Sequence, residues 1–163
     1  EKSSISALSN KLFTLSSIKQ ATRALLGKGP KEGFSDAEAS LACSFWQGVY
    51  RNMPDWQMAS RKEVSPAQLR QEYVHAHGVG LHALGMMGRS LICEHPETWQ
   101  DDLAQLKNID WRKTNPEWLR RTMLHGKLSK STTAIQLTCN ALKQALNLSL
   151  TPEEKVLEEQ VVQ

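Results

Sequence analysis

The sequence predicts an all-α fold, a single helical domain of about seven helices. Apolar residues recur at i, i+3 and i+4 in several windows, which is typical of helices with one buried face. Several of these windows begin with a residue that favours a helix N-cap, followed by proline or by glutamate or glutamine. No run of any length alternates with the period of a strand, and no Asn-Gly or Asp-Gly pair signals a hairpin. A chain of 163 residues is long enough to bury a real core.

The first part of the chain predicts two helices. Residues 1–11 are polar and rich in serine, so we expect a loosely ordered lead-in. A helix is predicted over residues 12–26, and Gly27 is suited to end it. The next helix begins at Ser35, which forms a capping box with Glu38, and ends near Pro54. Its predicted buried stripe comprises Ala42, Phe45, Trp46, Val49, Tyr50 and Met53.

Ser65 and Pro66 begin a third helix, which we expect either to continue to about residue 91 or to break near Gly78 to Gly80. Its four glycines cost about 1 kcal/mol each relative to alanine. Small residues on one helical face let another backbone approach closely. We therefore predict that this face is a packing centre or an interface; its members are His75, Gly78, His82, Gly85 and Arg89.

The histidines at positions 75, 77 and 82 do not have the i, i+4 spacing of a helical metal pair, and no cysteine or carboxylate lies close to them in sequence. We expect them to be polar core or interface residues, with no metal and no cofactor. No Ser/His/Asp or Cys/His arrangement of a nucleophile can be recognised. The expectation is that this chain is not an enzyme.

The second half predicts four more helices. One follows His95-Pro96 and buries Trp99, Leu103 and Leu106. Asn115 and Pro116 begin the next, which is predicted to reach about His125 before Gly126 stops it. A further helix follows the segment GKLSKST, with Ser129, Ser131 and Thr132 as candidate N-caps. Thr151 and Glu154 form a capping box for the last helix, where residues 153–159 carry a net charge of −3.

Positive charge is concentrated between Lys107 and Lys130. The residues of this range carry a net charge of +5, whereas the whole chain carries only +3. Cations and hydroxyls at the start of a helix form a reasonable anion site. The alternative is a solvated basic face with ordinary helix caps. If the cluster contacts phosphates of double-stranded DNA, the candidate residues are Arg112, Lys113, Arg120, Arg121, Lys127, Ser129, Lys130 and Ser131.

Composition limits where the protein works. No apolar run approaches the roughly 18 residues that span a bilayer, and the first residues lack the order of a secretory signal. The three cysteines are odd in number and far apart in sequence, which favours a reducing cytoplasm over a disulfide framework. Because the chain begins without methionine, we expect it to be a piece of a longer protein.

Three segments resemble the C-terminal half of the DndB family, which belongs to the bacterial DNA phosphorothioation (sulfur modification) cluster. They are EYVHAHGVGLHALGMMGRSL (residues 72–91), IDWRKTNPEW (109–118) and GKLSKSTTAIQLTCNALKQALNLSLTPEE (126–154). The segment SNKLFTLSSIKQATRALLG (9–27) is similar to the one that enters this region in the family. The tetrapeptide DGQHR, after which the wider group is named, is absent, so the resemblance implies a C-terminal helical region.

The resemblance implies a regulator of transcription, a repressor that binds promoter DNA of the modification cluster, rather than a sulfur-transfer enzyme. On this interpretation the basic helix-loop-helix at residues 112–131 would touch DNA phosphates. The alternative is a protein-interaction or dimerisation module of the same regulator, a homo-oligomer whose DNA is read by the absent N-terminal half. In that case the His75 to Arg89 face would be the contact surface.

Overall fold

The computed structural model describes residues 5, 6 and 8–162, and over these residues the chain is predominantly helical, as predicted. The α-helices are α1 (Leu15–Leu26), α2 (Asp36–Arg51), α3 (Pro54–Ser60), α4 (Pro66–Glu72), α5 (Gly78–Glu94), α6 (Trp99–Asp102), α7 (Thr132–Ala145) and α8 (Pro152–Val162). Three 3₁₀ helices are η1 (Val74–Ala76), η2 (Leu103–Asn108) and η3 (Pro116–Trp118), and β1 (Met123–Leu124) pairs with β2 (Lys127–Leu128). Most of the predicted lead-in, residues 1–4 and 7, lies outside the described residues.

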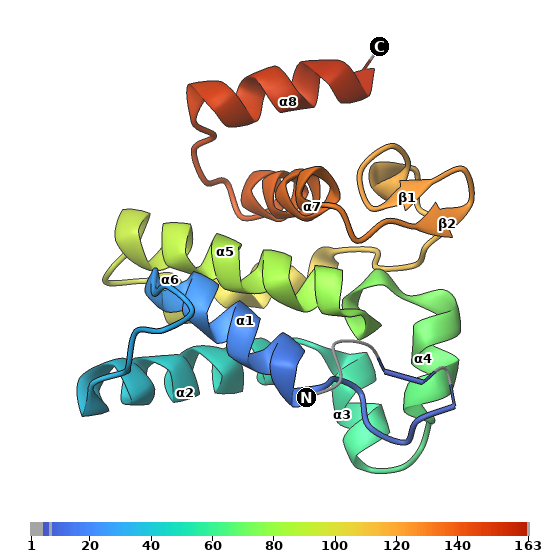
Figure 1. The fold of residues 1–163 in the computed structure, drawn as a ribbon, viewed down its shortest axis with the longest axis horizontal. Helices are drawn as coiled ribbons and strands as arrows, with labels where there is room; N and C mark the ends of the chain where they lie inside the picture. The colour runs from blue at the N-terminus through green and yellow to red at the C-terminus, as the bar shows by residue number, and fades with distance from the viewer. Residues whose placement is uncertain (1–4, 7, 163) are drawn as a thin grey trace.

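Helix α5 is the centre of the structure, with α1 packed on one side and α7 on the other (Figure 1). Its glycine face allows α1 to come close, as the small residues predicted. Beyond α7, the C-terminal α8 forms an outer layer with no buried residue of its own. Within the described residues, no helix is both long and apolar enough to cross a membrane.

Most predicted helix starts are confirmed by side-chain caps. The side chains of Ser35, Ser65 and Ser131 accept hydrogen bonds from backbone amides in the first turns of α2, α4 and α7. Thr151 and Glu154 form the reciprocal capping pair of α8. Helix α1 begins three residues later than predicted, because Thr14 caps it.

Buried stripes were predicted well. Trp99, Leu103 and Leu106 are buried on α6 and η2. On α2, Ala42, Phe45, Val49 and Met53 are buried, Trp46 is half-buried and Tyr50 is exposed.

The helix that begins at Ser65 breaks at Tyr73, slightly before the glycines. Tyr73 is extended because residues 73–74 run beside residues 111–113: the amide of Val74 donates to the carbonyl oxygen of Trp111 at 2.9 Å. The break moves His75 into the core, where its side chain is fully buried. There the indole N–H of Trp56 donates to His75 Nδ1 at 3.3 Å, and His75 Nε2 lies 2.9 Å from Asp55 Oδ2.

The helix predicted from Pro116 to about His125 is wrong. Asn115 does cap a turn, but only η3 forms before the chain turns into the β1–β2 hairpin. The Trp118 indole stacks on Trp111 with ring centroids 5.5 Å apart, and its N–H donates to the Asp110 carbonyl oxygen at 2.9 Å. This buried anchor holds residue 118 in place. The sequence predicts no hairpin, but a short one follows, and its turn residues His125 and Gly126 have φ of 50° and 75°.

Candidate nucleic-acid interface

The eight predicted phosphate-contacting residues do not form one surface. Because the helix over 116–125 is absent, the helix-loop-helix expected to carry them is absent too. They divide into four groups: Arg120 and Arg121, which face α8; Arg112, which a neighbouring carboxylate holds; Lys113 and Lys130, which line a pocket; and Lys127, Ser129 and Ser131, which lie in the hairpin and just before α7.

Arg120 and Arg121 face the acidic α8. Arg121 is 9% exposed, forms an ion pair with Glu158, and donates to the carbonyl oxygen of Glu117 at 3.0 Å. Arg120 stays exposed, and its guanidinium donates to the carbonyl oxygen of Val161 at 3.3 Å. Arg121 is therefore used by the fold, where it fastens α8 to η3 and the loop that follows.

Arg112 is exposed, but its charge is matched locally. Its Nε and Nη2 donate to the two carboxylate oxygens of Asp110 at 2.9 and 2.6 Å. These hydrogen bonds lower the pKa of the Asp110 carboxyl to about 2, so the pair stays ionised. Its net contribution to an anion site is small.

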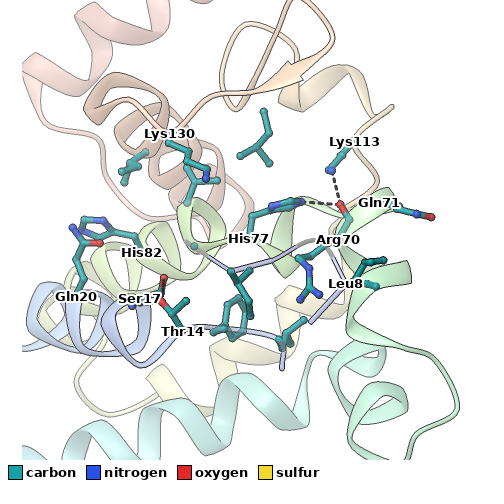
Figure 2. A pocket seen from close by; sticks show the side chains of 18 residues that line it. Leu8, Thr14, Ser17, Gln20, Arg70, Gln71, His77, His82, Lys113 and Lys130 are labelled. Carbon is teal, nitrogen blue, oxygen red and sulfur yellow. Dashed lines mark hydrogen bonds between the residues drawn. The ribbon is translucent and has the colours of Figure 1, made fainter. Parts of the chain in front are cut away.

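Lys113 and Lys130 converge on one pocket of about 600 Å³ (Figure 2). The pocket lies where the start of α1, α4, the start of α5 and the loop before α7 meet. Arg70 of α4 and His77, the residue before α5, also line it, and neither was among the predicted phosphate contacts. Nothing in the local pattern marks Arg70, because an arginine in the last turn of a helix is usually a surface residue.

The pocket has an excess of positive charge, since no acidic side chain is among the described residues that line it. The buried Arg70 guanidinium donates to the carbonyl oxygens of Lys11 and Ser9 at 2.8 and 2.5 Å. The ammonium of Lys113 and the ring Nε2–H of His77 both donate to the Arg70 carbonyl oxygen, at 2.5 and 2.8 Å. The acceptor of the Lys113 ammonium is a neutral carbonyl oxygen, so this hydrogen bond solvates the cation without cancelling its charge.

This environment lowers the pKa values of four pocket groups, Arg70, His77, His82 and Lys113, and burial is the largest cause for each. Burial is the largest cause for His77, followed by the positive charge of Lys113, and the pKa of His77 falls to about 4. Burial also lowers the pKa of Lys113. A lowered pKa is expected for a buried basic group whose charged form has no anion close to it.

The remaining predicted residues surround the start of α7. Ser131 is the N-cap, with its hydroxyl accepting from the Ala134 amide at 3.1 Å, and the Ser129 hydroxyl donates to Ser131 Oγ at 3.2 Å. Lys127 and Lys130 are exposed, as is the first residue of the helix, Thr132. The α7 N-terminus is therefore open to solvent, with Lys130 in the loop just before it and Lys127 in the hairpin before that loop.

The predicted interface face is largely covered within the chain. Gly78, Gly85 and Arg89 of α5 lie against the α1 side: Cβ atoms at the two glycines would meet Ser17 and Ala21, and the Arg89 guanidinium lies over Gly27. His82 is half-buried at the pocket, and His75 is in the core. Among the described residues, no three histidine, cysteine or acidic side chains are grouped to hold a metal ion, and Cys43, Cys93 and Cys139 are free thiols.

Comparison with known proteins identifies a matching family. The family model described as DndB, DNA-sulfur modification-associated, matches residues 1–149. The matched range contains the pocket and α7 and ends before α8. No curated protein and no solved structure matches the chain.

Proposed function

This chain belongs to the DndB family, which is associated with DNA sulfur modification, and we propose that it is the DNA-contacting helical part of a transcriptional repressor of a bacterial DNA phosphorothioate modification gene cluster. Its partner is double-stranded promoter DNA. It acts as a regulator and not as an enzyme, and it works in the cytoplasm. The family association supports the link to sulfur-modified DNA, and the basic surface supports the contact with phosphates.

One observation carries the DNA contact: Lys113 and Lys130 meet at the pocket beside the first turn of α7, Lys127 is exposed in the hairpin before that helix, and none of the three is in an ion pair among the described residues. Cations without a protein counterion gain most when a phosphate approaches, because the DNA releases its own condensed counterions. Ser129 and Ser131 lie in the same loop, where they can reach phosphate oxygens. Arg112 and Arg120 lie in the neighbouring segments. Arg121 does not contact DNA while it is paired with Glu158 of α8.

The experiment is a salt titration of binding to a promoter duplex with unphosphorylated ends. We expect log K to fall linearly with log salt, and the variant Lys127→Ala with Lys130→Ala to reduce the size of the slope by about 2. The matched control is Lys31→Ala, which removes an exposed lysine from the loop between α1 and α2. An unchanged slope in the double variant, with the wild-type affinity retained, would contradict this surface.

A second function, a dimerisation module whose DNA is read by another part of the regulator, is favoured by exposed apolar residues on α2, α3 and the loop before α2. Phe34, Tyr50 and Met58 are 42%, 40% and 37% exposed, and grooves lined by Trp46 and Tyr50 run beside them. The proposed occupant is a second copy of this chain. Light scattering should then show a dimer that Tyr50→Glu dissociates; a monomer at high concentration would count against this function.

A further inference from the structure

We infer that the basic pocket beneath Lys130 binds a phosphate monoester that carries an organic group of nucleotide size. This goes beyond contact with duplex DNA, which needs only the exposed surface. The pocket of about 600 Å³ lies within the usual range for ligand sites. A DNA duplex cannot enter it, because the duplex is wider than its major groove, which alone is about 12 Å across.

The charge of the pocket selects an anion. Two lysines from different segments, Lys113 and Lys130, approach it from the same side, with His77 between them and the first residue of α5 (Gly78) beside it (Figure 2). Lys113 is half-buried, and its one described hydrogen bond goes to a neutral carbonyl oxygen. A buried or half-buried ammonium costs free energy unless a negative group compensates it. A dianionic phosphate supplies that charge.

The rest of the pocket selects an organic group rather than a free inorganic ion. Apolar side chains from four segments line it: Leu12, Phe13, Val79, Leu128 and Ile135. At another part of the wall, His82 and Gln20 lie close together (Figure 2). The His82 Nδ1 atom is buried and has no hydrogen-bond partner among the described residues. A base or sugar could pack on this apolar wall beside His82 and Gln20.

The same chemistry could come from a free nucleotide or from the 5′-phosphate of a DNA end. Calorimetric titration of the whole chain distinguishes them, using adenosine monophosphate, adenosine, inorganic phosphate, and a short single strand with and without a 5′-phosphate. We expect adenosine monophosphate to bind about 10-fold or more tightly than adenosine or inorganic phosphate. If the phosphorylated strand binds more tightly than the mononucleotide, the source is a DNA end; the reverse order indicates a free nucleotide.

Variants separate the pocket from the duplex surface. Lys113→Met should weaken binding of the monophosphate by about 10-fold or more, because it removes the charge and keeps an unbranched side chain that is one atom shorter. The exposed Lys130→Ala should act in the same direction, and it keeps the test decisive if Lys113→Met does not fold. Leu12→Ala, which removes part of the apolar wall, should weaken binding of adenosine monophosphate while leaving binding of inorganic phosphate unchanged. Lys127→Ala is the control, since Lys127 does not line the pocket.

The proposal is overturned if neither monophosphate probe binds, or if Lys113→Met and Lys130→Ala bind adenosine monophosphate as the wild type does. Loss of duplex binding in Lys127→Ala, with binding of the monophosphate intact, would leave both proposals standing as separate functions. The reverse failure, duplex binding without any monophosphate binding, would remove the pocket proposal alone.

Discussion

A β-carbon placed on Gly85 would lie 2.2 Å from the carbonyl oxygen of Ala21, so α5 and α1 touch backbone to backbone at this point. Glycine in a helix costs about 1 kcal/mol relative to alanine, and close packing of the two helices offsets that cost. Because α1 also supplies the pocket wall at Ser17 and Gln20, the fit at Gly85 helps to position the proposed ligand site.

Gly85→Ala should destabilise the fold by about 1–3 kcal/mol, since the carbonyl of Ala21 cannot move without shifting α1. The free energy of unfolding in urea measures the effect. The control is Gly33→Ala, at a position where a new β-carbon would meet nothing within 4 Å. Equal stability of the two variants would show that α1 adapts freely.

His77 should make the fold less stable in mild acid. Its pKa is about 6.5 in the unfolded chain and about 4 in the fold, so the fold favours the neutral ring. The contribution of neutral His77 to the free energy of unfolding is fully present above pH 6.5. It is lost as the pH falls from 6.5 to 4, by about 3 kcal/mol in all. His77→Gln should flatten the stability profile between these pH values. An unchanged profile in the variant would show that other groups cause the loss.

Helix α8 should detach when its ion pairs are removed. Glu158 pairs with Arg121, and Glu154 accepts from Lys143 Nζ at 2.7 Å. Glu154→Gln with Glu158→Gln removes the carboxylate paired with the buried Lys143 and leaves Arg121 only the exposed Glu117 at 3.6 Å. We therefore expect amide protection in α8 to fall by about 10-fold or more in hydrogen exchange.

The matched control for α8 is Glu153→Gln with Glu159→Gln, which makes the same change of charge on the same helix. Both residues are exposed, and neither is in an ion pair among the described residues. If the two double variants lose equal protection, net charge rather than pairing holds α8.

The hairpin turn should be improved by asparagine. His125 has a φ of 50° and precedes Gly126 at 75°, the conformation that favours an Asn-Gly pair. We expect His125→Asn to stabilise the fold by about 0.5 kcal/mol, whereas His125→Val should destabilise it by about 1 kcal/mol, because a β-branched side chain resists positive φ. Thermal unfolding of both variants tests this, and the same sign of change in the two would contradict it.

Much of the helical fold could be predicted because its signals are local. A serine or threonine before α2, α4, α7 and α8 caps amides two or three residues away, and the buried stripes depend only on helical spacing. The helix predicted over 116–125 failed because Trp118 is held by Trp111 and Asp110, contacts to which no local pattern points.

The basic cluster shows the same division. The sequence alone determined that cations are concentrated between Lys107 and Lys130 and that a helix begins just after them. Only the tertiary structure decided that Arg121 pairs with α8 while Lys113 and Lys130 meet Arg70 and His77 at a pocket. The physical reason is that charge and capping are properties of neighbouring residues, whereas the partners of Arg121 and Lys113 lie in chain segments tens of residues away.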